Sequence, residues 1–489
     1  MRPSPDNWQQ ALQGEFGPLV DAWVDADASE RRAIDALLSL VSDREPPAPE
    51  LCTDSPRALR FLALRAVLRG RANELRQVAE AQVSAALDPG LTRRWLGLFD
   101  GTLVQSERSE SADGRIEEAC LSALEQLFLA DVPSAVQHAR RAVRMARAEA
   151  MVLHELLASI VLARCRRLQG RPHLAMRILA TVAEVAPPLF HGWVRYEQRF
   201  CGASVGEPDT SFAPEEHLNA FFDGLNRADI EGLSRAVSTA PAWVRRELCV
   251  LAESCVPQLP PSVSPAGWLD GRSVVCPAEI LGMCVPEIRD GGEQSPLLLL
   301  LDPQRPVRRV LVLGAPMMPG IRVPDSFEVK QGRAMATLAW LATEPDLDRA
   351  SLFERVYGFT YQSERHGGTL RVLLHRMRQG LPDGVRFGER LEVDEAALIP
   401  DPRVEFDQEA LVLRHLAKHQ GRASAREIAE ALGVSSRTVQ TVLRGMLDDG
   451  ICSSVRDGRR IEYRLEDTTL SEPTVSRLHP RGLTQLNEL

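Results

Sequence analysis

The chain has 489 residues, 44% of them hydrophobic and 26% charged, a composition typical of soluble globular proteins with about two to four domains. Its formal net charge of -9 excludes nucleic-acid binding through overall positive charge, so any DNA contact requires a local basic face. Nine scattered cysteines without a CxxC pair argue against a disulfide framework or a zinc site. The N-terminus has no apolar signal core and no apolar run could span a bilayer, so we expect a cytoplasmic location and no membrane partner.

Residues 1–255 are predicted to be helical nearly throughout, because apolar residues recur every three or four positions between short Gly, Pro or Asp turns. In the stretches 130–146 and 170–188, small and apolar residues recur at helical spacing: Ala135, Ala139, Ala142, Ala175, Leu179 and Val182. These stretches resemble tetratricopeptide repeats. The resemblance implies stacked helix pairs with a concave surface for a protein or peptide partner, or a part in a homodimer. A non-repetitive helical bundle is the alternative.

A proline-dense segment, 255–268, cannot continue a helix and is predicted to be a linker. Short runs rich in Val and Leu follow at 272–279, 295–302 and 308–314, and they are typical of strands. We therefore expect residues 256–295 to form a Pro-rich linker with short strands.

Residues 296–400 are predicted to form a unit of strands followed by helices. The expected order is an antiparallel strand pair within 297–314, helices at 331–346, 348–358 and 367–381, and a hairpin at 385–393. This order resembles the winged helix of OmpR/PhoB-type response regulators, mainly through 349–358 and 369–381. The resemblance implies that a helix from about Gly368 to Leu381 reads the DNA major groove. The candidate DNA-binding residues of this unit are Arg365, His366, Thr369, Arg371, His375, Arg376 and Arg378.

Two features of this unit depart from the OmpR/PhoB pattern. The hairpin region 387–397 is acidic, whereas the wings of the family are usually basic, and a Gly pair precedes the predicted reading helix. The alternative is a winged helix that packs against neighbouring parts of the protein or mediates dimerisation.

Residues 404–467 are predicted to fold as a second winged helix. An amphipathic helix at 407–421 precedes a helix that Ser424 caps and Gly433 ends, with Glu427 completing a capping box. A third helix starts at Ser435, and a hairpin with a basic tip follows it. The stretch 426–451 resembles winged helices of bacterial regulators of the MarR and IclR types, in which the third helix enters the major groove.

That resemblance implies that the polar face of the third helix and the arginines of the wing contact DNA. The candidate residues are Ser435, Ser436, Arg437, Gln440, Thr441, Arg444, Arg456, Arg459 and Arg460. Arginine and glutamine suit guanine and adenine edges, and short hydroxyls suit phosphate oxygens. The alternative is an ordinary solvated face opposite a core stripe.

The predicted fold class is mainly α with small β-sheets: a helical repeat-like N-terminal domain plus two winged helix-turn-helix domains, ending in a flexible tail at 468–489. We expect a bacterial transcription regulator that binds double-stranded DNA in a sequence-specific manner. A stiff link at 398–407 would let two reading helices span adjacent major grooves. No P-loop, GxSxG or HExxH motif is present, so no catalytic, cofactor or metal site is expected. A non-enzymatic scaffold whose winged helices bind protein is the alternative.

Overall fold

The computed structural model is mostly helical, with small antiparallel sheets, which confirms the predicted fold class. The structure describes residues 4–42, 44–104, 109–129, 131–168, 172–200, 212–226, 229–245, 247–248, 289–290, 293–294, 297–300, 332–343, 347–358, 360–381, 385–388, 391–393, 397–400, 408–418, 422–448, 451–457, 460–466 and 468–478. Within these residues, no helix is both long and apolar enough to cross a bilayer.

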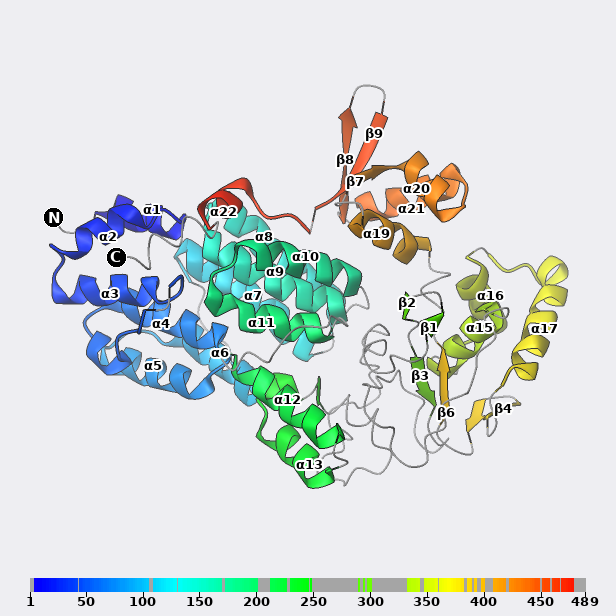
Figure 1. The fold of residues 1–489 in the computed structure, drawn as a ribbon, viewed down its shortest axis with the longest axis horizontal. Coiled ribbons are helices and arrows are strands. Elements are labelled where there is room, and N and C mark those ends of the chain that lie inside the picture. The colour runs from blue at the N-terminus through cyan, green and yellow to red at the C-terminus, as the bar shows by residue number, and fades with distance from the viewer. Residues whose placement is uncertain are drawn as a thin grey trace.

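The N-terminal domain is an array of helices that pack against their neighbours in sequence (Figure 1). The helices are α1 Pro5–Leu12, α2 Gly17–Trp23, α3 Ala28–Leu38, the 3-10 turn η1 Pro49–Cys52, α4 Pro56–Leu68, α5 Ala72–Ser84, α6 Gly90–Asp100, α7 Ala112–Phe128, α8 Val132–Ala148, α9 Val152–Leu168, α10 Pro172–Val185, α11 Pro188–Phe200, α12 Ala213–Asn226 and α13 Ile230–Thr239. Side chains of Asp27, Ser111 and Asp131 cap the first turns of α3, α7 and α8.

The small residues identified in the sequence lie where helices meet. All six residues at those positions of α8 and α10 are fully buried: Ala135, Ala139, Ala142, Ala175, Leu179 and Val182. Small side chains let neighbouring helix axes approach closely, and α7, α8, α9 and α10 pack against one another in the middle of the domain (Figure 1). The assignment of these helices to tetratricopeptide repeats stays a prediction.

Helix α9 is buried along almost its whole length and carries charged residues into the core. The guanidinium groups of Arg164 and Arg167 each pair with the carboxylates of Glu197 and Glu247, at N–O distances of 2.7–2.9 Å. The Tyr196 hydroxyl also donates to Glu247. Every charge of this group has an opposite partner, which is what allows it to remain in a low-dielectric core.

In the part of the second unit that the structure describes, there are three helices and three short antiparallel strand pairs. Its elements are β1 Arg289–Asp290, β2 Glu293–Gln294, β3 Leu297–Leu300, α15 Gly332–Thr343, α16 Arg349–Tyr357, α17 Ser363–Gln379, β4 Val385–Phe387, β5 Leu391–Val393 and β6 Ala397–Pro400. Strand β3 pairs with β6, so the two ends of the unit meet, and β4 pairs with β5 as the expected hairpin. The second strand predicted within 297–314 lies outside the described residues.

Helix α17 starts at Ser363, earlier than the sequence predicted, and the Gly pair lies inside the helix. The His366 ring stacks on Phe353 of α16, with ring centroids 4.8 Å apart, and its Nδ1 accepts a hydrogen bond from the Gln362 N–H. These two contacts stabilise the first turn and explain why the helix extends past the glycines.

The third unit has the order of a winged helix. Its elements are α19 Gln408–Lys418, β7 Arg422–Ser424, α20 Ala425–Leu432, α21 Ser436–Asp448, β8 Cys452–Asp457 and β9 Arg460–Leu465. Strand β9 lies between β7 and β8 in one antiparallel sheet, and β8 and β9 extend from the helices as a two-stranded wing (Figure 1).

The prediction of a flexible tail is wrong for residues 468–478. This segment leaves the winged helix, returns to the N-terminal domain and forms the short helix α22, Glu472–Arg477, against α9 (Figure 1). Its polar side chains suggested a solvated tail, but they bond to a buried acid and a backbone carbonyl far away in the sequence. Residues 479–489 lie outside the described residues.

Candidate nucleic-acid interface

The turn between α20 and α21 is fixed by local hydrogen bonds. Ser424 and Glu427 form the predicted capping box at the start of α20. Gly433 ends that helix with a φ of +64°, in the left-handed region that glycine adopts readily. The Ser435 hydroxyl then accepts a hydrogen bond from the Thr438 N–H, at 3.1 Å, and starts α21. The entry angle of α21 therefore follows from residues identified in the sequence.

One face of α21 is anchored in a small apolar core. Val439, Leu443 and Met446 are each at most 1% exposed, and they pack with apolar residues of α19 and α20. Val442 and Leu447 are half-buried against the same core, so the solvent-exposed face of α21 is the opposite one.

The outward face of α21 carries the predicted reading residues. Ser436, Arg437, Gln440, Thr441 and Arg444 are all exposed. No ion pair among the described residues engages Arg437 or Arg444, so both guanidinium groups can meet an anion. Two hydroxyls are partly used within the helix: Thr441 donates to the Arg437 carbonyl, and Ser435 serves as the cap.

The wing adds further positive charge. Arg456 on β8 and Arg460 on β9 are exposed near the tip of the hairpin, and Arg459 lies outside the described residues. Val455 and Ile461 are each 51% exposed on the same hairpin, which the sequence reasoning did not identify. In the sequence, each of these residues is next to an arginine of the hairpin, and this alternation could have indicated that they are exposed.

Helix α17 presents a second basic face. Arg365, Thr369, Arg371, His375, Arg376 and Arg378 are all exposed along it. No ion pair among the described residues engages the four arginines, although the Arg378 guanidinium lies over the Phe387 ring of β4, 5.4 Å from its centroid. Val372, 51% exposed in the middle of this face, was missed by the sequence reasoning.

His366 is the one candidate on α17 that faces inward. Its ring is half-buried against Phe353, and Nδ1 is occupied by the Gln362 N–H. Its position indicates a role in holding the first turn of α17 rather than in reaching a ligand.

The third unit is also similar in sequence to a known family of winged helices. Residues 407–460 match the MarR family. The match runs from α19 to the start of β9, so it covers the MarR-type winged helix and leaves the helical domain and the α15–α17 unit outside it. A MarR-type domain indicates DNA-binding transcription regulation at this end of the chain. No curated protein and no solved structure matches the chain.

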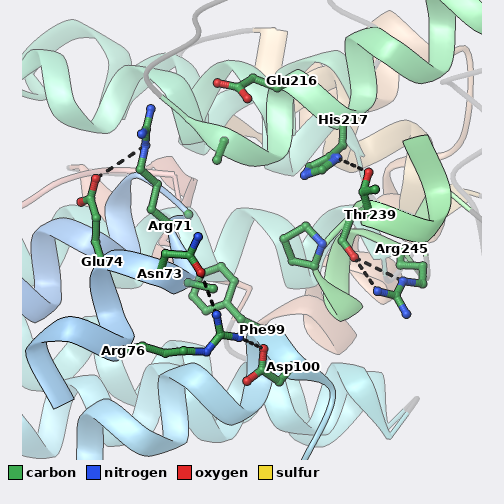
Figure 2. Close-up of a pocket in the computed structure, with 15 residues that line it drawn as sticks. Arg71, Asn73, Glu74, Arg76, Phe99, Asp100, Glu216, His217, Thr239 and Arg245 are labelled. Carbon is green, nitrogen blue, oxygen red and sulfur yellow. Dashed lines mark hydrogen bonds and ion pairs between the residues drawn. The ribbon is translucent and has the colours of Figure 1, made fainter. Parts of the chain in front are cut away.

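The helical domain also contains a polar cavity of about 520 Å³ between α5 and α6 on one side and α12 and α13 on the other (Figure 2). Arg71, Arg76 and Arg245 line it together with Glu74 and Asp100. Arg76 already bonds to Asp100 and Asn73, and Arg245 bonds to the Ala240 carbonyl. Glu216 also lines the cavity, so its three arginines are matched by three acids and the lining carries no excess of formal charge with His217 neutral. Among the described residues, no cluster of His, Cys, Asp or Glu could hold a metal ion.

Proposed function

We propose that this chain is a transcription regulator that binds specific DNA sequences through the exposed face of α21. The observation that carries the proposal is the exposed pair Arg437 and Arg444 on a capped helix inside a MarR-type domain, a pair that no ion pair among the described residues engages. On a helix, positions seven apart lie on one side, two turns from each other. The pair therefore spans a stretch of groove about 10 Å long.

Each exposed side chain of α21 has a suitable partner in duplex DNA. An arginine can donate two hydrogen bonds to guanine, and Gln440, between the two arginines, can bond in a bidentate manner to adenine. Ser436 and the wing arginines Arg456 and Arg460 suit phosphate oxygens on either side. The sequence specificity would come from Arg437, Arg444 and Gln440, which contact bases. The salt dependence would come mainly from the residues that contact phosphates.

A gel shift with fragments selected from genomic DNA tests this proposal. We expect binding that weakens steeply with salt, and a loss of about 1–3 kcal/mol for each of Arg437→Ala and Arg444→Ala. The matched control is Arg93→Ala with Arg115→Ala, which removes two exposed arginines from the helical domain. If the wild-type chain binds no fragment at low salt, the proposal fails and a protein-binding scaffold becomes the better reading.

We also propose that α17 makes a second DNA contact, as the OmpR/PhoB resemblance implies. Its support is the exposed row of Arg371, His375 and Arg378 and the absence of ion-pair partners for its arginines among the described residues. Footprinting should then show two protected major-groove segments about one helical turn apart. If a single segment is protected, and an Arg371→Ala/Arg378→Ala variant leaves that protection unchanged, α17 does not contact DNA.

We propose that the helical domain, residues 1–255, binds a protein or peptide partner or forms a dimer, as expected from the sequence. Its stacked helices α7 to α10 offer the kind of extended surface that suits a peptide. Sedimentation of the purified chain, alone and with DNA, tests the dimer directly.

A further inference from the structure

Residues 468–478, which we call the strap, are held by a buried acid of the helical domain. Glu155 of α9 is 1% exposed. Its carboxylate accepts hydrogen bonds from the Ser471 N–H, from the Ser471 hydroxyl and, at 2.6 Å, from the Thr474 hydroxyl. Arg147 of α8 pairs with the same carboxylate at 2.8 Å. Among the described residues, three of the four groups that bond to this buried charge therefore come from the strap.

The C-terminal end of the strap also contacts the helical domain. Arg477 donates to the Gln13 carbonyl and pairs with Glu15 at 2.9 Å, and Leu478 is fully buried in the core of the helical domain. Gly14 faces this contact with a φ of +90°. A Cβ atom there would lie only 3.0 Å from the Cβ of Arg477, so the surface is shaped to receive the strap.

The near end joins the strap to the MarR-type winged helix. Thr181 of α10 donates to the Thr468 carbonyl at 3.0 Å, and Arg147 donates to the Thr469 carbonyl. Beside it, Leu174 of α10 is fully buried within the core of the winged helix, where α10 packs on α19. The winged helix is thus attached to the helical domain by its own core and by the strap that follows it.

We propose that the helical domain is a receptor for the chain's own strap, and that strap binding holds the MarR-type winged helix in its DNA-binding position. The reading face of α21 stays exposed while the strap is bound, so the bound form is the one that can engage DNA. This coupling rests on the proposed function; the docking of the strap does not. This coupling is reciprocal. A partner that displaced the strap would lower the affinity for DNA, and bound DNA would weaken the binding of that partner by the same factor.

The first test measures hydrogen exchange in the full chain. A six-residue helix such as α22 is unstable on its own, so protection of its amides reports docking. We expect protected amides at Ser471 and at residues 475–478 in the wild-type chain, and exchange at least about tenfold faster in a Ser471→Ala/Thr474→Val variant, which removes two hydrogen bonds to a buried charge. The matched control is Glu472→Gln/Ser476→Ala on the exposed side of α22. A synthetic peptide of residues 468–478, added in excess, should also raise exchange in the strap.

The second test measures the consequence of release. We expect the Ser471→Ala/Thr474→Val variant to show a larger radius of gyration and a DNA affinity at least about fivefold lower, the lower end of common coupling strengths. Unprotected strap amides in the wild-type chain, or unchanged exchange in the variant, would overturn the docking. Faster exchange with unchanged DNA affinity would overturn the coupling. If the wild-type chain binds no DNA, the proposed function fails. Hydrogen exchange and the radius of gyration would then still show whether the strap is docked.

Discussion

At the residue scale, the start of α20 depends on a reciprocal pair. The Ser424 hydroxyl accepts from the Glu427 N–H, and the Glu427 carboxylate accepts from the Ser424 N–H. Two backbone N–H groups that the helix leaves unpaired are satisfied in this way. Ser424→Ala should therefore lower the free energy of unfolding of the MarR-type winged helix by about 1 kcal/mol, measured by urea denaturation. A change no larger than that of Ser454→Ala, an exposed serine of the wing, would contradict the role of the cap.

The same pair has a pH signature. Hydrogen bonds from the Ser424 side chain and backbone lower the pKa of the Glu427 carboxyl below its ordinary value of 4.5. Because the folded pKa is the lower one, the stabilisation is complete above pH 4.5 and is lost as the pH falls through the folded value. We expect Glu427→Gln to reduce the acid sensitivity of the winged helix in denaturation as the pH is lowered below 4.5, relative to Glu462→Gln.

Gly433 allows a prediction with a clear magnitude. A Cβ atom at this position would meet nothing within 4 Å, so only the left-handed backbone opposes a side chain. Gly433→Ala should therefore cost about 1–2 kcal/mol of stability and no more. The loss should be visible as a lower denaturation midpoint, with the reading of DNA unchanged in specificity. Gly445→Ala, also without neighbours and helical, is the control and should be neutral or stabilising.

At the scale of elements, the helices and turns of the winged helix could be predicted because their signals are local. The capping box, the glycine at the turn and the apolar stripe of α21 all lie within 23 residues of one another in 424–446. The start of α17 could not be predicted, because its first turn depends on the stacking of His366 against Phe353 of another helix. Nor could the sequence show that the arginines of α9 face inward, since their partners come from residues 30–83 positions later.

The buried charges of α9 provide an element-scale prediction. Glu197→Ala would remove one of the two carboxylates with which Arg164 and Arg167 each pair in the core. Breaking a buried pair in this way typically costs about 3–5 kcal/mol, so the helical domain should unfold at markedly lower urea concentration. Arg76→Ala removes one member of the half-exposed pair with Asp100 and should cost less than about 1 kcal/mol. Equal losses in the two variants would contradict this account.

At the scale of the whole molecule, the four cysteines in described residues are buried in two domains: Cys52, Cys120 and Cys165 in the helical domain and Cys452 in the winged helix. Burial raises the pKa of the Cys52 and Cys452 thiols to about 11 and that of Cys165 to about 12, and it also raises that of Cys120. These thiols are protonated and enclosed at neutral pH, so alkylation under native conditions should leave all four unmodified in peptide mapping. The same reagent in guanidinium should modify them. Labelling of Cys452 alone would indicate that the winged helix opens independently of the helical domain.

The strap is the feature that sequence reasoning misjudged at this scale. A polar segment rich in Ser, Thr and Pro is typical of a tail, and its partner Glu155 lies 316 residues earlier than Ser471. No local pattern can connect positions so far apart. The sequence did contain one indication: Glu155 lies within the apolar stretch of α9. A buried carboxylate needs hydrogen-bond donors, so a partner for Glu155 had to come from elsewhere in the chain.

The strap also imposes an order on how the protein is made. At about 5–20 residues per second, a ribosome reaches Ser471 roughly 15–60 s after Glu155 has been added. During that interval α9 and its neighbours can fold while the carboxylate still faces water with Arg147 as its partner. The native arrangement is then completed by a late, long-range closure, and a nascent chain halted before the strap would expose Glu155 and the surface that the strap covers.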